Sequence, residues 1–440
     1  MSREVDLLHE LINNACVNDG TVDSGNEHRS VSTLVDFFGV DGEIFEPAPG
    51  RQSLVYRVRG IDPEAPSLAL VPHLDVVPAE VAGWHTDPFK ATEVDGLIHG
   101  RGAVDMLNVT AAMAEAVRPY LRGDLKPAGD LIFAAVADEE SGGVYGAVPL
   151  VDDHWDLVGA DYLLGEVAYP PFEDASEPGV PVAIGEKGPF WSILKAEGTP
   201  GHGSSPYLGD NALGKIVRAL NGIFESESLA AISVEWVEFL EASGLDESTV
   251  ADLTDLDRLD AAIERIAVNN PLFARYAHAA THMTVSPNRA LAGTKVNTIP
   301  DRARAELDVR ALPGMTRSDV DAHLRKAMGS GSDQLEIEPV MDFEANVSRH
   351  PSTLWETIGQ SVEALEGHRN LVPTLMTVST DARFWRARGT IAYGVGLFDD
   401  RIGFSEMLSM FHGNDERVSA ESVERTTLLY REILSRFGRG

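Results

Sequence analysis

Cysteine is nearly absent from this chain, in which Cys16 is the only one. A single cysteine excludes an intramolecular disulfide and any metal site built from several cysteines. The chain also lacks a run of about 18 apolar residues, the length that a membrane-spanning helix requires. Its N-terminal stretch mixes charged with apolar residues and therefore lacks the hydrophobic core of a signal peptide. These absences predict a soluble protein of the cytoplasm.

Positive charge is scarce as well. The 440 residues include 36 Lys and Arg but 69 Asp and Glu, which gives a formal net charge of −33. A field of this sign repels nucleic acid and anionic membranes, so neither is expected as a partner. The hydrophobic fraction of 43% is ordinary for a globular protein, and the length allows two or three domains.

Short apolar runs alternate with helical patterns in the first part of the chain. Two amphipathic helices are predicted before about residue 40, and a third after Asp105. The same alternation resumes after about residue 345. Strands alternating with helices indicate an α/β fold with parallel strand pairs in its sheet. The predicted strands of the first part lie at 53–60, 68–75, 131–138 and 161–168.

The stretch from 188 to 344 has a different order of elements. It is predicted to run strand-helix-strand-strand-helix-strand, which is the order of the ferredoxin-like split motif. Residues 226–280 inside it form an acidic insertion with helical patterns. The sequence therefore predicts one α/β domain, formed by 1–187 and 345–440, that is interrupted by a ferredoxin-like domain.

Carboxylates and one histidine follow the predicted strands or precede a helix. In open α/β sheets, ligands bind at the carboxyl ends of the strands, so these side chains are expected to meet there. A Glu-Glu pair alone is more often part of a solvated loop, but several acids on one rim favour a binding site. The side chains concerned are His73, Asp105, Glu139, Glu140 and Glu166.

The pattern His-x-Asp occurs three times, beginning at His73, His85 and His154. With 13 His and 69 acidic residues, about this number is expected by chance, so the spacing alone carries no information. Only His73 follows a predicted buried strand, where Asp75 can hold its second ring nitrogen or stand beside it. The other two histidines are expected at the surface.

Clustered carboxylates raise one another's pKa values unless cations neutralise them. Two divalent ions that share one carboxylate would provide this neutralisation. Histidine combined with carboxylates is also a ligand set that suits zinc. The residues therefore favour a metal site at this rim.

The motif set resembles a two-zinc amidohydrolase family. This family includes aminoacylase, acetylornithine deacetylase, succinyl-diaminopimelate desuccinylase, glutamate carboxypeptidase and carboxypeptidase S. The resemblance extends from about residue 6 to about residue 435. It implies a zinc-peptidase-like catalytic domain with a mixed central sheet, interrupted by a lid and dimerisation domain. It rests on His73-x-Asp75, the turn 100–105, Asp138-Glu139-Glu140, Glu166 and the late His412.

The metal ligands follow from this resemblance. It implies two zinc ions, for which cobalt or manganese can substitute, with Asp105 between them. His73 and Glu166 would complete one metal site, and Glu140 and His412 would complete the other. Without the family pattern, a lone late histidine such as His412 reads as an ordinary surface or core residue.

The resemblance also implies roles around the metals. Asp75 would orient the neighbouring metal-binding histidine. Glu139 would be the general acid/base, which takes a proton from a water between the metals and passes it to the leaving amine. His202 would stabilise the oxyanion, in the family in the active site of the partner subunit of a homodimer. Asn297 and Arg310 would bind the carboxylate of the substrate.

The implied function is metal-dependent hydrolysis of an amide bond in an N-acyl amino acid or a small peptide with a free carboxylate. A dipeptidase, or a deacetylase or desuccinylase of the same family, is the alternative within this class. A non-catalytic, metal-stabilised binding protein is the alternative from another class, and the complete set of ligands argues against it. A serine hydrolase is disfavoured because no G-x-S-x-G elbow is present. The HExxH motif fails, since no histidine stands four residues after His9.

Overall fold

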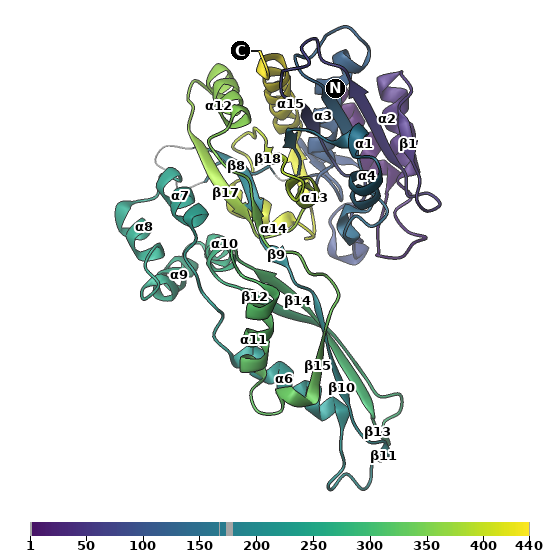
Figure 1. Ribbon diagram of the computed structural model, residues 1–440, viewed down its shortest axis with the longest axis vertical. Coiled ribbons are helices and arrows are strands. Elements are labelled where there is room, and N and C mark those ends of the chain that lie inside the picture. The colour runs from purple at the N-terminus through teal and green to yellow at the C-terminus, as the bar shows by residue number, and fades with distance from the viewer. Residues whose placement is uncertain (1, 167, 173–178, 440) are drawn as a thin grey trace.

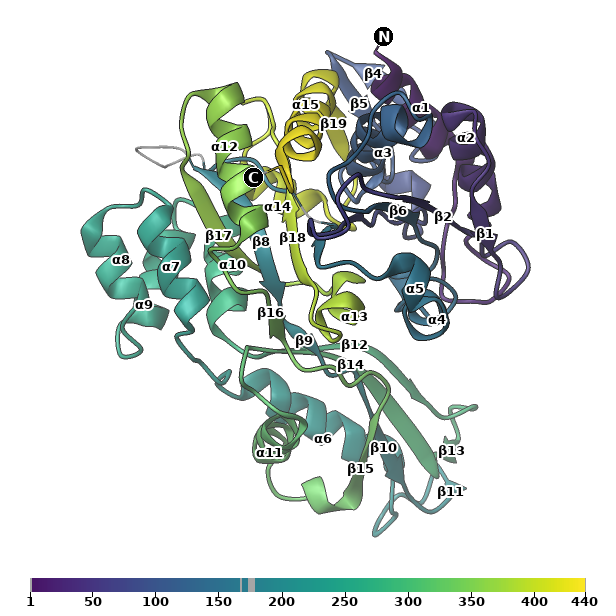
Figure 2. The same cartoon turned by 45° about the horizontal axis from the view of Figure 1, so that its top comes forward.

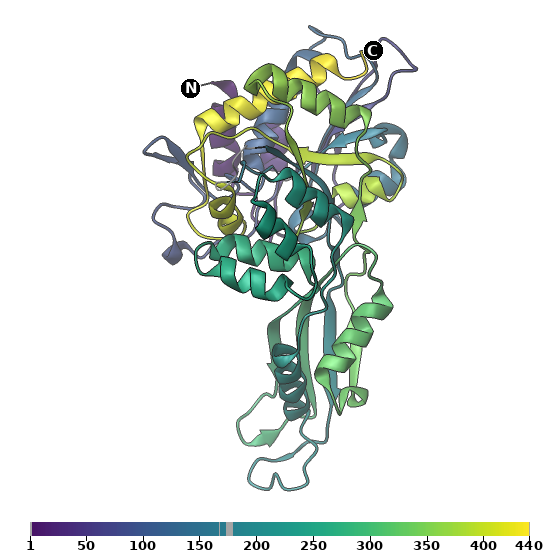
Figure 3. The ribbon, with the colours of Figure 1, turned by 90° about the vertical axis from the view of Figure 1, so that its left-hand side faces the viewer.

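The computed structural model describes residues 2–166, 168–172 and 179–439. They form a broad main body (residues up to 187 and from 344), which contains both chain ends, and a narrower arm (188–226 and 283–343) (Figure 1). Figure 3 shows the arm extending away from the main body. No helix of the described residues is long and apolar enough to cross a lipid bilayer.

The main body is built on a mixed sheet, which has nine strands in the described part of the chain. The middle strands β6, β3, β7 and β18 run parallel to one another, whereas the β1–β2, β2–β6 and β18–β8 pairs are antiparallel. The predicted mixed central sheet is therefore confirmed. The strands, in spatial order, are β1 (Glu43–Phe45), β2 (Ser53–Val58), β6 (Leu131–Ala135), β3 (Leu68–Leu70), β7 (Tyr162–Leu164), β18 (Ile391–Val395), β8 (Val180–Glu186) and β16 (Asn346–Val347), with β17 (Leu371–Met376) also beside β8.

Helices cover both faces of this sheet. Successive side chains of a strand point to opposite faces, so its buried strands present apolar side chains on both faces for helices to pack on. In β6, Phe133 packs with the helices of one face and Ile132 with those of the other. The first face carries α1 (Arg3–Asn14), α2 (His28–Phe38), α3 (Leu107–Leu121), α12 (Thr353–Glu366) and α15 (Ala420–Arg436). The second face carries α4 (Ala147–Asp153), α5 (Trp155–Val158) and α13 (Ala382–Arg386).

The arm contains an antiparallel sheet in the order β12-β14-β10-β15. Two helices pack on one face of it around buried residues such as Leu194 and Val309. A short ribbon of β11 and β13 forms the far end of the arm (Figure 1). In chain order the elements are β9 (Gly188–Pro189), β10 (Ser192–Glu197), β11 (Gly201–His202), α6 (Ala212–Glu225), β12 (Thr284–Ala292), β13 (Thr298–Ile299), β14 (Arg302–Ala311), α11 (Arg317–Met328) and β15 (Leu335–Pro339).

The acidic insertion forms a helical bundle that leaves the arm and packs on the main body (Figure 2). Its aromatic core is shared with Val372 and Met376 of β17 and with Phe404 of α14 (Phe404–Met410). The bundle therefore buttresses the edge of the main sheet. Its helices are α7 (Val234–Ala242), α8 (Glu247–Leu253), α9 (Leu259–Ala267) and α10 (Pro271–Thr281).

Two chain segments connect the main body to the arm, and they lie side by side. The first leaves β8 and enters β9, and the second returns from the arm into β16, which pairs with β8. Between them, the backbone N–H of Phe343 donates to the carbonyl oxygen of Pro189 at 3.1 Å. The arm is thus joined to the main body by this narrow paired connection, in addition to the helical bundle that packs on β17.

Candidate metal centre

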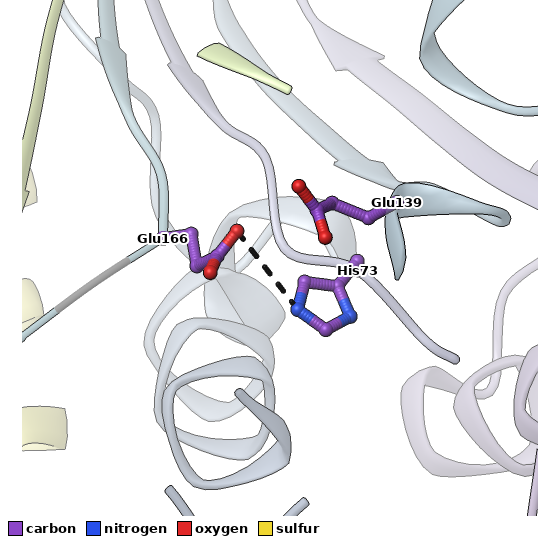
Figure 4. Close-up of side chains that lie close together, drawn as sticks. All are labelled: His73, Glu139 and Glu166. Atoms are coloured by element: carbon purple, nitrogen blue, oxygen red, sulfur yellow. Dashed lines mark ion pairs between the residues drawn. The ribbon is translucent and has the colours of Figure 1, made fainter. Parts of the chain in front are cut away.

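Three loops leave the main sheet at the same edge. His73 follows β3, Glu139 and Glu140 follow β6, and Glu166 follows β7. Because these three strands are parallel, their carboxyl ends meet, as the sequence predicts. Figure 4 shows His73, Glu139 and Glu166 pointing toward one another, with a distance of 3.9 Å between His73 Nε2 and Glu166 Oε2.

Asp105 and His412 join this group from distant parts of the chain. A small sheet of β4 (Thr92–Val94), β5 (Leu97–His99) and β19 (Arg417–Ser419) brings the loop 100–105 beside the segment before β19. Asp105 Oδ1 then lies 3.3 Å from His73 Nε2, and its Oδ2 lies 3.3 Å from His412 Nε2. His412 Nε2 is also 3.1 Å from Glu140 Oε2. The structure therefore brings together all five residues that the resemblance assigns to metal binding.

This geometry fits two cations. The two oxygens of Asp105 face two different histidines, as a carboxylate between two ions requires. Ligand atoms of His73, Asp105 and Glu140 all lie within 4.8 Å of one another, and so do those of His73, Glu139 and Glu166. Glu140 Oε1 and Glu166 Oε2 are buried without a hydrogen-bond partner, which leaves two acceptors free for an ion.

Burial and neighbouring charges shift the pKa values of the side chains in this cluster. Burial, and then the charge of Asp381, raises the pKa of Glu139 well above its usual value. Burial raises the pKa of Glu140 and that of Glu166, and neighbouring carboxylates add to both shifts. Contacts with Asp105 and Glu140 raise the pKa of His412 to about 10. The raised pKa values of the three glutamates reflect their burial and the excess of negative charge that the protein gathers here.

The carboxylate of Asp75 is not the group nearest to the second ring nitrogen of His73. His73 Nδ1 lies 3.0 Å from the backbone oxygen of Asp75 but 3.6 Å from its carboxylate. The Asp75 carboxylate accepts hydrogen bonds from the backbone N–H groups of Glu139 and Glu140, each at 3.2 Å. Asp75 therefore holds the turn that carries the two glutamates, in addition to standing beside His73.

A buried ion-pair network, which the sequence did not reveal, lies behind this turn. Arg51 Nη2 donates to Glu27 at 2.8 Å and to Asp138 at 2.7 Å, and each of these side chains is at most 2% exposed. Asn18 Nδ2 links Asp138 to Asp75, at 3.1 and 2.8 Å. No local pattern marks these residues, because the partners are far apart in the chain.

Glu416 is a second residue that sequence reasoning missed. Its carboxylate accepts hydrogen bonds from the backbone N–H groups of Gly102, Val104 and Asp105, at 2.7 to 3.0 Å, and from Arg101. The side chain is fully buried. Glu416 thus fixes the loop that delivers Asp105. In the sequence, its position four residues after His412 was the feature that could have indicated a place near the site.

A cavity of about 400 Å³ opens onto the cluster. Of the residues predicted to bind substrate, Arg310 lies on its wall. Arg310 Nε and Nη2 donate to Asp308, at 2.7 and 3.2 Å, and Nη1 donates to Ser379 at 2.9 Å. The lining residues are Val77, Asp105, Glu139, Glu140, Gly142, Glu166, Trp191, Asp308, Arg310, Met341, Val378, Ser379, Arg383, Phe411 and His412.

His202 and Asn297 lie elsewhere, at the far end of the arm. His202 belongs to β11, and the backbone oxygen of Asn297 accepts from the N–H of Gly203 at 2.8 Å. Both residues are exposed. Arg310 stands near the opposite end of β14, a ten-residue strand that spans about 30 Å at about 3.3 Å per residue. Within one chain, Asn297 therefore does not lie beside Arg310 as expected, because Asn297 is at the ribbon and Arg310 is at the cavity.

Comparison with known proteins places this geometry in a family. The family model described as Peptidase family M20/M25/M40 matches residues 69–436. Succinyl-diaminopimelate desuccinylase of Rhodospirillum centenum is 33% identical over 181 residues, which are 40% of this chain and 45% of that protein. The enzyme of the same name from Xanthobacter autotrophicus is 33% identical over 168 residues, or 37% of this chain and 42% of that protein. The chain thus matches less than half the length of these curated relatives.

Solved structures share the fold over the whole chain. An M20 family metallo-carboxypeptidase from Sulfolobus solfataricus is 17% identical with a TM-score of 0.74, covering 100% of both chains. Human carnosine dipeptidase 1 is 16% identical with a TM-score of 0.69, covering 99% of this chain and 96% of that one. The predicted family resemblance is confirmed. Since the family model matches most of its length, the chain belongs to the peptidase family M20/M25/M40.

Proposed function

We propose that the protein is a metal-dependent hydrolase that cleaves the amide bond of an N-acyl amino acid or a small peptide with a free carboxylate. The observation that carries this proposal is the placement of Asp105, whose two oxygens each lie 3.3 Å from a different histidine. The cavity beside it also presents a guanidinium, that of Arg310. A metal-stabilised binding protein would need the residues that hold the ions but would not need Glu139 beside them.

Five residues would hold the metals. Asp105 would bridge two zinc ions, with His73 and Glu166 on one and Glu140 and His412 on the other. Cobalt or manganese would fit the same oxygen and nitrogen ligands. When bound, such ions lower the pKa of water toward neutrality and polarise a carbonyl group.

Glu139 has the environment of a general acid/base. The residue is 9% exposed and lines the cavity, and burial raises its pKa, which strengthens its carboxylate as a proton acceptor. Its carboxylate takes a proton from water while the water oxygen bonds to the amide carbon. When the C–N bond breaks, Glu139 returns this proton to the amine nitrogen. The products are a carboxylic acid and an amine.

Arg310 is placed to hold the substrate carboxylate. Asp308 occupies its Nε and one N–H of Nη2, and Ser379 accepts from Nη1. The guanidinium carries five N–H donors, so two remain for a carboxylate. The fixed fork would set the distance between this carboxylate and the scissile amide.

Metal removal and a substrate panel test the function directly. A chelator is expected to abolish hydrolysis of N-acetyl amino acids and dipeptides, and zinc, cobalt or manganese should restore it. Metal analysis of the purified protein should give two ions per chain. Two bound ions without cleavage of any member of the panel would instead support the binding protein.

We propose, further, that residues 188–344, which comprise the arm and the helical bundle, are a lid and dimerisation domain, with the catalytic domain formed by 1–187 and 345–440. Two observations favour dimerisation. The helix α6 exposes an apolar face through Leu213, Val217 and Phe224, which are 41%, 55% and 70% exposed. His202 and Asn297 are far from their own cavity, so they would serve the cavity of a partner copy. The cytoplasmic location remains a prediction from the sequence.

Mixing two inactive variants tests the role of His202 in the partner. His202→Ala and Glu139→Ala are each expected to be inactive, because each removes one essential group from every site. In an equal mixture that exchanges subunits, half of the dimers are mixed and one of their two sites is intact. Activity should therefore return to about a quarter of the wild-type value by this counting. No recovery, with exchange shown by mass spectrometry, would contradict action across the dimer.

Glu416→Ala tests the support of the metal ligand Asp105. The substitution leaves the three N–H groups of the loop without their acceptor, so the bridging carboxylate loses its fixed position. Loss of such an outer partner typically lowers metal affinity by about 10- to 100-fold. Titration with zinc in competition with a chelator measures this shift. The substitution Glu424→Ala, at an exposed position of α15, serves as the control and should leave the affinity unchanged.

A further inference from the structure

The cavity has a charged floor and apolar walls. Its floor is the carboxylate and histidine cluster, and its walls are partly exposed apolar side chains from both the main body and the arm. The main body contributes Val77, Val378 and Phe411, and the arm contributes Trp191 and Met341. A substrate whose amide lies at the floor would therefore place an apolar group against these walls.

Trp191 and Met341 form one unit on the arm. The backbone N–H groups of Val340 and Met341 both point to the carbonyl oxygen of Trp191, at 2.8 and 3.3 Å. The indole Nε1 donates to Asp308 at 2.9 Å, and the Arg310 guanidinium lies 5.6 Å from the indole ring. Trp191 is thus held in place by the same carboxylate that holds the proposed carboxylate-binding arginine.

Gly142 of the main body lies beside Met341 of the arm in the lining of the cavity. A Cβ atom at position 142 would lie 3.0 Å from Met341 Cε, and the backbone there has a φ of +98°. A side chain at this position would therefore crowd the methionine as well as strain the backbone. The bare backbone at Gly142 leaves Met341 space above the charged floor.

The lining offers little positive charge for a second carboxylate. Its arginines, among the described residues, are Arg310 and Arg383. The Arg310 side chain is 19% exposed, but that of Arg383 is 3% exposed. Arg383 lies against Phe343 and Phe384, at 5.5 and 4.4 Å from the ring centroids, and donates to backbone oxygens. His412 also lines the cavity, but its Nε2 faces Asp105 and Glu140, so Arg310 is the side-chain cation that is accessible to pair with a substrate carboxylate.

We infer that the preferred substrates carry a single carboxylate together with a bulky apolar group, and that Trp191 and Met341 select for this group. This inference rests on the proposed hydrolase function and narrows its substrate class. An acyl group or side chain with its own carboxylate, such as succinyl, would place an unpaired charge against the apolar walls. That arrangement costs binding energy through desolvation.

Two matched pairs of compounds test the preference, because each pair exchanges a carboxylate for an isopropyl group of similar shape. The first pair is N-(4-methylpentanoyl)-alanine and N-succinyl-alanine, and the second is N-acetyl-leucine and N-acetyl-aspartate. In the metal-loaded protein, kcat/KM is expected to be at least about tenfold higher for the apolar member of each pair. Equal values, or a preference for the second carboxylate, in either pair would overturn the inference.

Binding separates this inference from the hydrolase proposal. The same four compounds are titrated calorimetrically into the metal-loaded Glu139→Gln variant, in which turnover does not consume them. If the wild type hydrolyses nothing, the proposed function fails while the binding comparison still decides the preference. Tighter binding of both apolar members supports the inference, and weaker, equal or undetectable binding of them contradicts it.

Variants of Trp191 test its selecting role. Trp191→Ala should lower kcat/KM for N-acetyl-leucine at least about tenfold but change that for N-acetyl-glycine less than about threefold. Trp191→Phe, which keeps a ring but loses the bond to Asp308, should retain most of the preference. The exposed Val268→Ala in the helical bundle is the control and should leave both values unchanged. Equal losses on the two substrates in Trp191→Ala would show that Trp191 only positions Arg310.

Discussion

Replacing Glu139 by alanine is expected to reduce turnover by about 100- to 10,000-fold while the two metal ions stay bound. The glutamate lines the cavity, lies next to the proposed ligand Glu140 and is nearly buried. Positioned proton transfer is worth a factor of this size, and a methyl group cannot supply it. Steady-state kinetics on an N-acyl amino acid, with metal content measured on the same sample, checks both halves of this expectation.

The neighbouring Glu140→Ala is the matched control for this experiment. It removes the same carboxylate from the adjacent position, where the side chain contacts His412 at 3.1 Å. This variant should lose metal as well as activity. Glu139 also belongs to a possible ligand group with His73 and Glu166. Loss of metal from Glu139→Ala would therefore show that Glu139 is a ligand and that another group moves the proton.

Replacing Arg51 by methionine is expected to destabilise the main body by about 3–5 kcal/mol. The guanidinium is 1% exposed and pairs with Glu27 and Asp138, which are also buried. Methionine fills similar space but leaves two carboxylates without their cation in a medium that solvates them poorly. Urea unfolding followed by tryptophan fluorescence gives the change in stability.

Arg59→Met provides the comparison on the surface of the same sheet. Arg59 pairs with Asp130 at 2.6 Å, but its side chain is 77% exposed. A pair of this kind contributes about 0–1 kcal/mol, because water screens both charges. Equal losses for Arg51→Met and Arg59→Met would contradict the view that burial of the network makes it important.

The sequence predicted the side chains that follow the central strands because those positions are locally encoded. His73, Glu140 and Glu166 each come after an apolar run, and parallel strands bring such positions to one edge. Asp105 sits in a glycine-rich turn before a helix, which is also a local pattern. His412 has no such signal, since an irregular loop delivers it, and the family resemblance was needed to single it out.

The residues that hold the ligands could not be predicted in the same way. Arg51 and Asp138, or Glu416 and the loop 100–105, meet only when the chain has folded, and a buried charge looks like a surface charge in a sequence. The strand β8 was also missed. Its residues are entirely buried but include Pro181 and Gly185, which interrupt a strand pattern. Proline has no backbone N–H to donate to a neighbouring strand. Pro181 is nevertheless tolerated, because β18 pairs with β8 only at Val182 and Ala183.

The order of strands in the main sheet has a consequence for the newly made protein. β18 lies between β7 and β8, yet it is synthesised after the arm and the helical bundle. A nascent chain that has just completed β8 must therefore leave a gap in its central layer until the last part of the polypeptide emerges from the ribosome. Long-range pairing of this kind slows folding and exposes apolar edges to aggregation. Premature termination anywhere before β18 would yield a product that lacks a closed hydrophobic core and also lacks His412.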